Sequence, residues 1–171
     1  MSVIGVVSMK GGAGKTSITA NLATAMATKL GPERVRVIDL DPQNGLQWHF
    51  GFNGMQASGV CAQSLSGESW RAATTASEFG VACLPYGEAS ESEREAFESL
   101  LQKQPDWVAT QIKQAKLGDD AVVFIDTPPG PSGYLKQVFD SAALIVIVLL
   151  ADAGSYATIP AMESWINDMT A

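Results

Sequence analysis

The sequence predicts an α/β domain in which a mostly parallel sheet carries helices on both faces. Short apolar segments rich in Val and Ile alternate with longer segments whose apolar residues recur at helical spacing. Repeated strand–helix units of this kind favour a parallel sheet with right-handed crossovers. A glycine-rich loop also joins the first predicted strand to the first predicted helix. A chain of 171 residues can form one domain with its own core, and we expect that domain to cover residues 1–171.

The boundaries of these elements come from turn residues. Gly31 and Pro32 end the first helix, because glycine leaves the helical conformation easily and proline cannot continue the hydrogen-bond pattern. Ser66 and Gly67 close the second helix, and Asp106 starts the fourth. Short apolar runs between the helices are the strands. In chain order, the predicted strands are 3–8, 34–40, 80–84, 121–126 and 144–150, and the predicted helices are 15–30, 59–65, 91–104, 106–117, 131–142 and 159–169.

The longest apolar run covers residues 142–151. It has about half the length that a membrane-spanning helix needs, so we do not expect it to cross a bilayer. Its centre, 145–148, consists only of β-branched residues, which are typical of strands. We therefore expect this strand to be buried on both faces of the parallel sheet.

The loop at the end of the first strand reads Lys10-Gly11-Gly12-Ala13-Gly14-Lys15-Thr16. Backbone N–H groups of such a loop converge on phosphate oxygens, and the start of the following helix adds partial positive charge. We expect Lys15 to contact the β- and γ-phosphates and the Thr16 hydroxyl to bind Mg²⁺. The alternative is a glycine-rich turn that binds no phosphate and whose lysines are solvated. The predicted nucleotide-binding residues are Gly11, Gly12, Ala13, Gly14, Lys15, Thr16 and Ser17.

Aspartates follow two of the predicted strands. Asp39 and Asp41 stand at the end of the second strand, and Asp126 follows four apolar residues at the end of the fourth. Open α/β sheets bind their ligands at the carboxyl ends of the strands, and Mg²⁺ prefers oxygen ligands there. Alone, such aspartates could merely cap loops. With the phosphate loop upstream, they predict a functional role at a metal site to which Thr16 and Asp126 contribute.

These three motifs resemble those of the deviant P-loop ATPases, the family of ParA and MinD. The loop departs from the general P-loop pattern because Met9 replaces its first glycine and Lys10 is added. The resemblance implies ATP and Mg²⁺ as cofactors and a homodimer in which Lys10 crosses to the partner's nucleotide. It further implies that Asp41 orients the attacking water and that residues 128–130 sense the γ-phosphate. The same resemblance adds Asp39 to Thr16 and Asp126 as a metal-site residue, which helps to hold Mg²⁺ through water. Lys10, Lys15 and Asp41 are thus the expected catalytic residues.

Short sequence segments between residues 67 and 107 are similar to those in one branch of this family, whose members are accessory to bacterial cellulose synthesis. That resemblance implies subunits of the cellulose synthase complex as partners. Full members continue with further strands, so we expect this chain to be the first two-thirds of a longer P-loop NTPase that lacks its C-terminal strands. A naturally short protein is the alternative. Trp70 and Trp107, at two helix starts, are expected to be packing anchors.

Charge and cysteine content bear on whether the protein binds DNA and in which compartment it works. The net charge is −7, and Lys10 and Lys15 are already assigned to the nucleotide among eleven Lys and Arg residues. DNA is therefore an improbable partner, since phosphate contacts need many cations. Two cysteines in no metal spacing and no recognisable signal peptide indicate a reduced, cytoplasmic protein, recruited at most indirectly to the membrane. A DNA-binding partition ATPase and a nucleotide-holding scaffold with negligible turnover stay open as alternatives.

Overall fold

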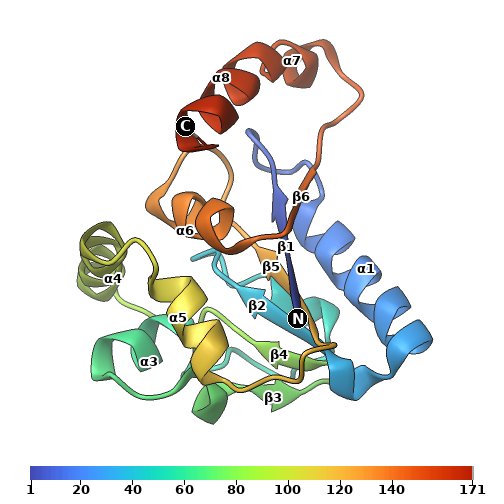
Figure 1. Cartoon of the computed structure of the whole chain (residues 1–171), viewed down its shortest axis with the longest axis vertical. Helices are drawn as coiled ribbons and strands as arrows, with labels where there is room; N and C mark the ends of the chain where they lie inside the picture. The colour runs from blue at the N-terminus through green and yellow to red at the C-terminus, as the bar shows by residue number, and fades with distance from the viewer. Residues whose placement is uncertain (171) are drawn as a thin grey trace.

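The sheet is the centre of the protein, as the computed structural model shows for residues 1–170 (Figure 1). Within this part of the chain the six strands lie in the order β3-β4-β2-β5-β1-β6. All neighbours are parallel except β3 and β4, which are antiparallel. The predicted mostly parallel α/β fold is therefore confirmed. The strands are β1 (Ser2–Val7), β2 (Val35–Asp39), β3 (Thr75–Ala76), β4 (Ala82–Leu84), β5 (Val122–Asp126) and β6 (Leu144–Ile147).

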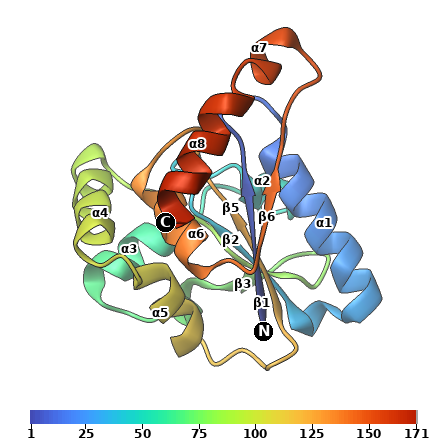
Figure 2. The same cartoon turned by 45° about the horizontal axis from the view of Figure 1, so that its top comes forward.

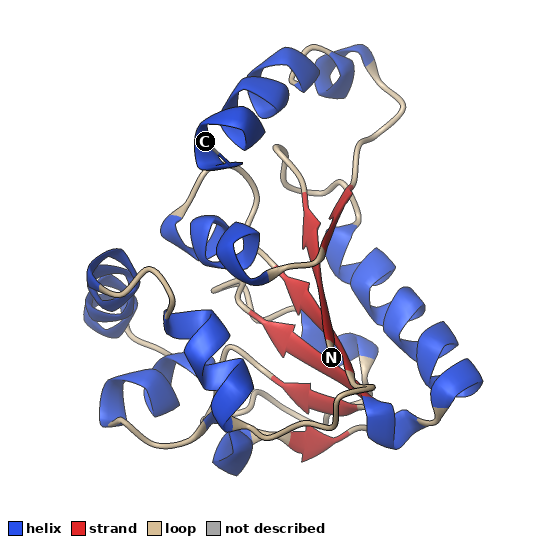
Figure 3. Ribbon diagram, in the orientation of Figure 1, coloured by secondary structure: helices blue, strands red, loops and turns tan. Residues whose placement is uncertain are grey.

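Helices cover both faces of this sheet (Figure 3). The helices α1 (Lys15–Leu30) and α2 (Leu46–His49) lie on one face. On the other face lie α3 (Val60–Ser66), α4 (Glu91–Lys103), α5 (Trp107–Gln114) and α6 (Gly133–Ser141). The chain continues with α7 (Ala153–Tyr156) and α8 (Ile159–Thr170), and two 3₁₀ helices, η1 (Pro32–Arg34) and η2 (Trp70–Ala73), complete the elements.

Alternation along β2 divides the core into two layers. Val35 and Val37 face α1, whose Ala20 and Ala23 let the helix approach the sheet closely. Ile38 joins the opposite layer, which also contains the aromatic side chains of Tyr86, Phe97 and Tyr134. The helix α8 packs beside α6, where the rings of Phe139 and Trp165 have centroids 5.9 Å apart (Figure 2).

Helix boundaries agree with the capping residues that the sequence contains. Gly67 ends α3 in the left-handed conformation, with φ 73°. The helix α4 begins with a capping box, in which the side chains of Ser90 and Glu93 each accept the other's backbone N–H. The helix α5 ends three residues earlier than expected, at Gln114. The short elements α2, α7, β3, η1 and η2 were not predicted, because two to four residues show no periodicity.

The prediction for the last strand is wrong in one respect. The strand β6 ends at Ile147 rather than at residue 150, and it lies at the edge of the sheet. Leu144 is 55% exposed and Ile147 41% exposed, so this strand is not buried on both faces in the described chain. The reason is its position, because an edge strand has a neighbour on one side only. Among residues 1–170, no helix combines the length and apolar composition that crossing a bilayer requires.

The two tryptophans and the two cysteines have structural surroundings. Trp70 is buried, and its indole N–H donates to the Ser64 hydroxyl at 2.9 Å. Trp107 donates to the same hydroxyl at 3.2 Å, so both rings anchor the layer of α3 and α5 as expected. Cys61 and Cys83 are free and buried, in agreement with a reduced chain.

Gly59 provides a test of the packing between α3 and the segment that follows β4. A Cβ atom at Gly59 would lie 2.4 Å from the Pro85 carbonyl oxygen and 2.5 Å from the Gly87 nitrogen. Backbone atoms cannot yield as a flexible side chain does, so we expect Gly59→Ala to lower the free energy of unfolding by at least about 2 kcal/mol. Urea denaturation measures this value. Gly133→Ala is the matched control, because no atom lies within 4 Å of its Cβ position, and equal stability of the two variants would contradict this packing.

Candidate functional site

The loop between β1 and α1 has the conformation of an anion cradle. Gly12 and Gly14 have φ values of 75° and 91°, which residues with side chains rarely adopt. A Cβ atom at either position would meet no atom within 4 Å, so the glycines border open space. Gly14 caps α1 without any side-chain hydrogen bond, and the first helical bond runs from the Ile18 N–H to the Gly14 carbonyl. The N–H groups of the first helical turn therefore remain available for a ligand.

Lys15 opens α1 and is buried, with only 5% of its surface exposed. Its backbone carbonyl accepts a hydrogen bond from the Thr19 hydroxyl at 2.9 Å, which anchors the first turn of the helix. Thr16 lies beside Gly45, whose Cβ position would be 3.8 Å from the Thr16 methyl group. The loop that follows β2 therefore lies against the start of α1, and the two predicted motifs meet in space.

The strand register brings two of the predicted aspartates side by side. Asp39 is paired with Asp126 across β2 and β5, and both are completely buried. The Asp39 carboxylate accepts the backbone N–H groups of Asp41 at 2.9 Å and Leu46 at 3.0 Å. Asp39 thus fixes the path of the loop from Asp41 to Leu46, a role that the sequence analysis did not foresee.

The two carboxylate oxygens of Asp126 differ in their hydrogen bonding. Its Oδ1 accepts the Thr19 hydroxyl at 3.3 Å, whereas its Oδ2 is buried and has no hydrogen-bond partner among the residues that the structure describes. Burial raises the pKa of Asp126, and Asp41 adds to this effect, while Thr16 and Lys15 act in the opposite direction. Burial and the neighbouring Asp126 also raise the pKa of Asp39. A cation placed here would relieve both the burial and the repulsion.

Asp41 lies just beyond the end of β2 and is 8% exposed. One of its carboxylate oxygens accepts the Gln43 backbone N–H at 2.9 Å. Burial raises the pKa of Asp41, and the positive charge of Lys15 opposes that shift. Asp41 and Lys15 therefore influence each other electrostatically at the edge of the cradle.

These residues fit a magnesium ion bound together with phosphates. No group of three His, Cys, Asp or Glu side chains within residues 1–170 could hold a metal ion by itself. Mg²⁺ is commonly held by one or two carboxylates together with substrate phosphates rather than by a complete protein cage. The unpartnered Oδ2 of Asp126 and the hydroxyl of Thr16, which lies in the same cluster, are the oxygen donors that such a site requires.

The segment after β5 contacts the loop from its other side. The Gly130 N–H donates to the Ser8 carbonyl at 2.9 Å, and the Thr127 hydroxyl donates to the Val6 carbonyl at 2.8 Å. The ring of Pro129 would lie 3.9 Å from a Cβ atom at Gly11. Residues 128–130 therefore lie directly against the loop between β1 and α1.

Lys10 lies apart from the other site residues. Its ammonium group forms an ion pair with Asp152 at 3.7 Å, and about half of each side chain is exposed. Asp152 also caps α7 by accepting the Ser155 N–H. Figure 1 shows α7 at the same end of the sheet as the loop. Asp152 was missed by the sequence analysis, although an aspartate three residues before a serine N–H is a recognisable cap.

Comparison with known proteins places the chain in one family. The sequence model of the family "Cellulose biosynthesis protein BcsQ" matches residues 1–164. A BcsQ protein of Salmonella typhimurium is 30% identical over 157 residues, which cover 91% of this chain and 62% of that protein. The maintenance of carboxysome distribution protein A of Gloeobacter kilaueensis is 31% identical, over 93% of this chain and 50% of that protein. The chain thus spans about three fifths or less of these relatives.

Solved structures show the same fold. Cobyrinic acid a,c-diamide synthase of Mycobacterium smegmatis, with a bound ATP analogue and magnesium, superposes with a TM-score of 0.84 at 24% identity, over 98% of this chain and 68% of that one. A plasmid partition protein of Borrelia burgdorferi bound to AMPPNP gives a TM-score of 0.74 at 17% identity, over 99% and 70% of the two chains. The fold is therefore that of the P-loop NTPases.

Proposed function

Because the chain belongs to the BcsQ family of cellulose biosynthesis proteins, we propose that it is a Mg·ATP-dependent switch that dimerises and assists assembly or localisation of the cellulose synthesis machinery. One observation carries the nucleotide part of this proposal. A cradle of free backbone N–H groups lies beside the buried Lys15 and the unpartnered carboxylate oxygen of Asp126. ATP and magnesium, as bound by the diamide synthase that shares the fold, supply the charges that this arrangement lacks.

Each residue of the site has a distinct part in the proposed mechanism. Lys15 neutralises negative charge on the β- and γ-phosphates, and Thr16 with Asp126 holds the metal ion. Asp39 shapes the loop that carries Asp41, and Asp41 positions a water molecule in line with the terminal phosphate. The bound metal ion supplies further neutralisation of the phosphate charge. Lys10 acts on the nucleotide of the partner subunit after it leaves Asp152.

Replacing the buried lysine tests the cradle. We expect Lys15→Ala to weaken nucleotide binding at least about 100-fold, because it removes a charge-assisted contact to the phosphates. Titration with a fluorescent ATP analogue in excess Mg²⁺ measures the affinity. Lys29→Ala, in the last turn of the same helix, is the control and should bind normally. Unchanged binding by Lys15→Ala would mean that the loop does not hold phosphates.

Replacing Asp41 tests turnover. We expect Asp41→Ala to retain nucleotide binding and to hydrolyse ATP at least about 100-fold more slowly, since it removes the group that positions water. Phosphate release at steady state measures the rate. Asp39→Ala should instead lower nucleotide affinity, because it releases the loop between Asp41 and Leu46. Negligible turnover of the unmodified protein would favour the nucleotide-holding scaffold over the ATPase.

Replacing Lys10 tests the dimer. We expect Lys10→Ala to bind nucleotide as the unmodified protein does but to lose ATP-dependent dimerisation, measured by sedimentation velocity. Asp152→Asn is the control, because asparagine can still cap α7 while the ion pair is lost. This control should dimerise at least as well as the unmodified protein. An unchanged dimer of Lys10→Ala would contradict the role of Lys10 across the interface.

A further inference from the structure

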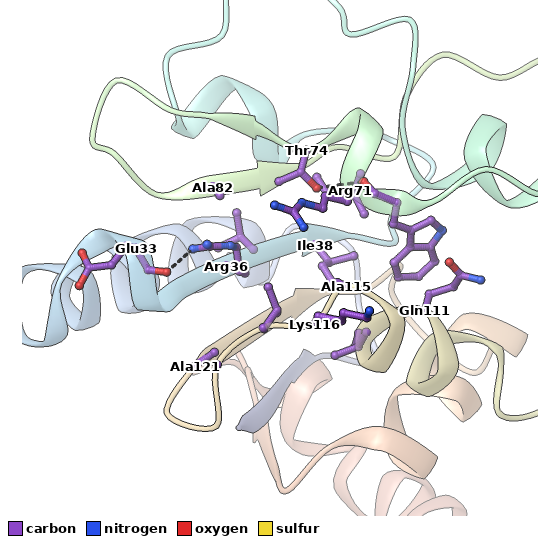
Figure 4. Close-up of a pocket in the computed structure, with 16 residues that line it drawn as sticks. Glu33, Arg36, Ile38, Arg71, Thr74, Ala82, Gln111, Ala115, Lys116 and Ala121 are labelled. Atoms are coloured by element: carbon purple, nitrogen blue, oxygen red, sulfur yellow. Dashed lines mark hydrogen bonds between the residues drawn. The ribbon is translucent and has the colours of Figure 1, made fainter.

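A cavity outside the nucleotide site lies over the middle of β2, where Arg36, Val37 and Ile38 line it. It has a volume of about 360 Å³ and is bounded by β2, β4, η2 and the end of α5 (Figure 4). Arg36 is the second residue of β2 and lines the cavity, whereas Asp39 is the last residue of this strand. The size is within the range of pockets that hold small molecules. The cavity is therefore separate from the phosphate loop, although both use the same strand.

The floor of this cavity is apolar. Ile38 and Leu84 come from neighbouring strands, and Ile112 comes from α5. Trp70 closes one side, with its indole N–H already bonded to Ser64. The cavity exists because Ala82, the register partner of Arg36, is small and because α5 ends before it covers this part of the sheet.

Three cations from three different elements stand around this floor. Arg36 comes from β2, Arg71 from η2, and Lys116 from the turn after α5. Figure 4 shows Arg71 and Lys116 on opposite sides of Ile38. Within residues 1–170, none of the three forms a recorded salt bridge, and the Arg36 guanidinium donates only to backbone carbonyls, including that of Glu33 at 2.7 Å.

The acidic balance of the chain makes this cluster unusual. The sequence has 18 acidic and 11 basic residues, yet Glu33 is the one acidic residue among those that line the cavity. The Glu33 carboxylate lies against Gly31 rather than Arg36, since a Cβ atom at Gly31 would be 2.4 Å from one of its oxygens. Positive charge at the mouth of this cavity is therefore not neutralised by a carboxylate of its lining.

The backbone holds Lys116 in a conformation that favours glycine. Its φ is 49°, in the left-handed region, directly after the last turn of α5. Glycine at this position would fit the backbone better, so the fold alone does not require lysine. Replacement by glycine therefore separates the effect of the charge from the effect on stability.

We propose that this cavity binds a small organic anion, with a flat apolar body on the floor and a phosphate or carboxylate group that Arg71 and Lys116 recognise, while Arg36 keeps its bonds to backbone carbonyls. Guanidinium groups recognise both kinds of anion, and their planar faces also stack on flat rings. The volume accommodates a body of one or two rings. This site is independent of nucleotide binding at the phosphate loop, so either proposal can fail without the other.

The test uses phenyl phosphate and benzoate as probes, with uncharged benzyl alcohol as the matched control. Nuclear magnetic resonance titration follows the Trp70 indole N–H and the amides of Ala82 and Ala115, which line the cavity. We expect one or both anions to shift these signals to saturation, and benzyl alcohol to bind at least about tenfold more weakly. The comparison of phenyl phosphate with benzoate identifies the preferred anionic group.

Variants then assign the binding to Arg71 and Lys116. Arg71→Gln combined with Lys116→Gly should weaken the anion at least about tenfold, because each removes a charge-assisted contact. Lys116→Gly alone should also raise Tm, which excludes unfolding as the cause of weaker binding. Lys113→Gln removes an equal charge from α5 outside the cavity and should bind normally.

Three results would overturn the proposal. The first is the absence of shifts at the cavity residues with both anions. The second is unchanged affinity of the Arg71→Gln and Lys116→Gly double variant. The third is loss of the cavity shifts in Lys15→Ala, which would place the anion at the phosphate loop instead.

Discussion

The burial of acidic side chains at the carboxyl ends of β2 and β5 is the constraint on which the site depends. Parallel register pairs Asp39 with Asp126 and Val6 with Asp126, so the end of β1 and its loop arrive beside the same carboxylates. Two buried carboxylates side by side repel each other, and burial raises the pKa of both. The fold limits this cost with backbone donors to Asp39 and with Lys15, but within the described part of the chain one oxygen of Asp126 has no hydrogen-bond partner. A nucleotide-bound cation is the natural complement of that arrangement.

The same constraint explains how the surrounding segments are held. Asp39 bonds the loop after β2 at both of its ends, and Thr19 joins α1 to Asp126. The segment after β5 bonds to Ser8 at the start of the loop. Each segment that would touch a nucleotide is therefore tied to a neighbouring one by a hydrogen bond. Because these hydrogen bonds connect the loop after β2, α1 and the segment after β5, a change of charge at the cradle can move all three segments at once.

Two surfaces of the described chain stand outside this site. The edge strand β6 exposes Leu144 and Ile147, and the following residues Leu149 and Leu150 are also exposed. Over the middle of β2, three cations surround an apolar cavity. Relatives in the BcsQ family are longer than this chain, which spans 62% of the Salmonella protein. Family membership and fold are thus established for this chain, and the experiments above address its activity.

The sequence alone determined the fold class and the nucleotide motifs, because these depend on local chemistry. Strand–helix alternation, the glycines at 12 and 14 and the strand-ending aspartates can all be recognised without tertiary contacts. Capping residues such as Gly67 likewise marked where a helix ends. Local conformations that depend only on near neighbours in the chain were therefore predictable.

Only the tertiary structure decided which residues meet. The apolar composition of β6 suggested burial on both faces, but its place at the sheet edge left Leu144 and Ile147 exposed. The ion pair between Lys10 and Asp152 joins residues that are far apart in the sequence, and Asp39 turned out to organise a loop through two backbone donors. Arg36, Arg71 and Lys116 carry no common motif, and they form a cluster only because strand order and the early end of α5 bring them together. Non-local proximity of this kind depends on register and packing, which a single sequence does not encode in any local pattern.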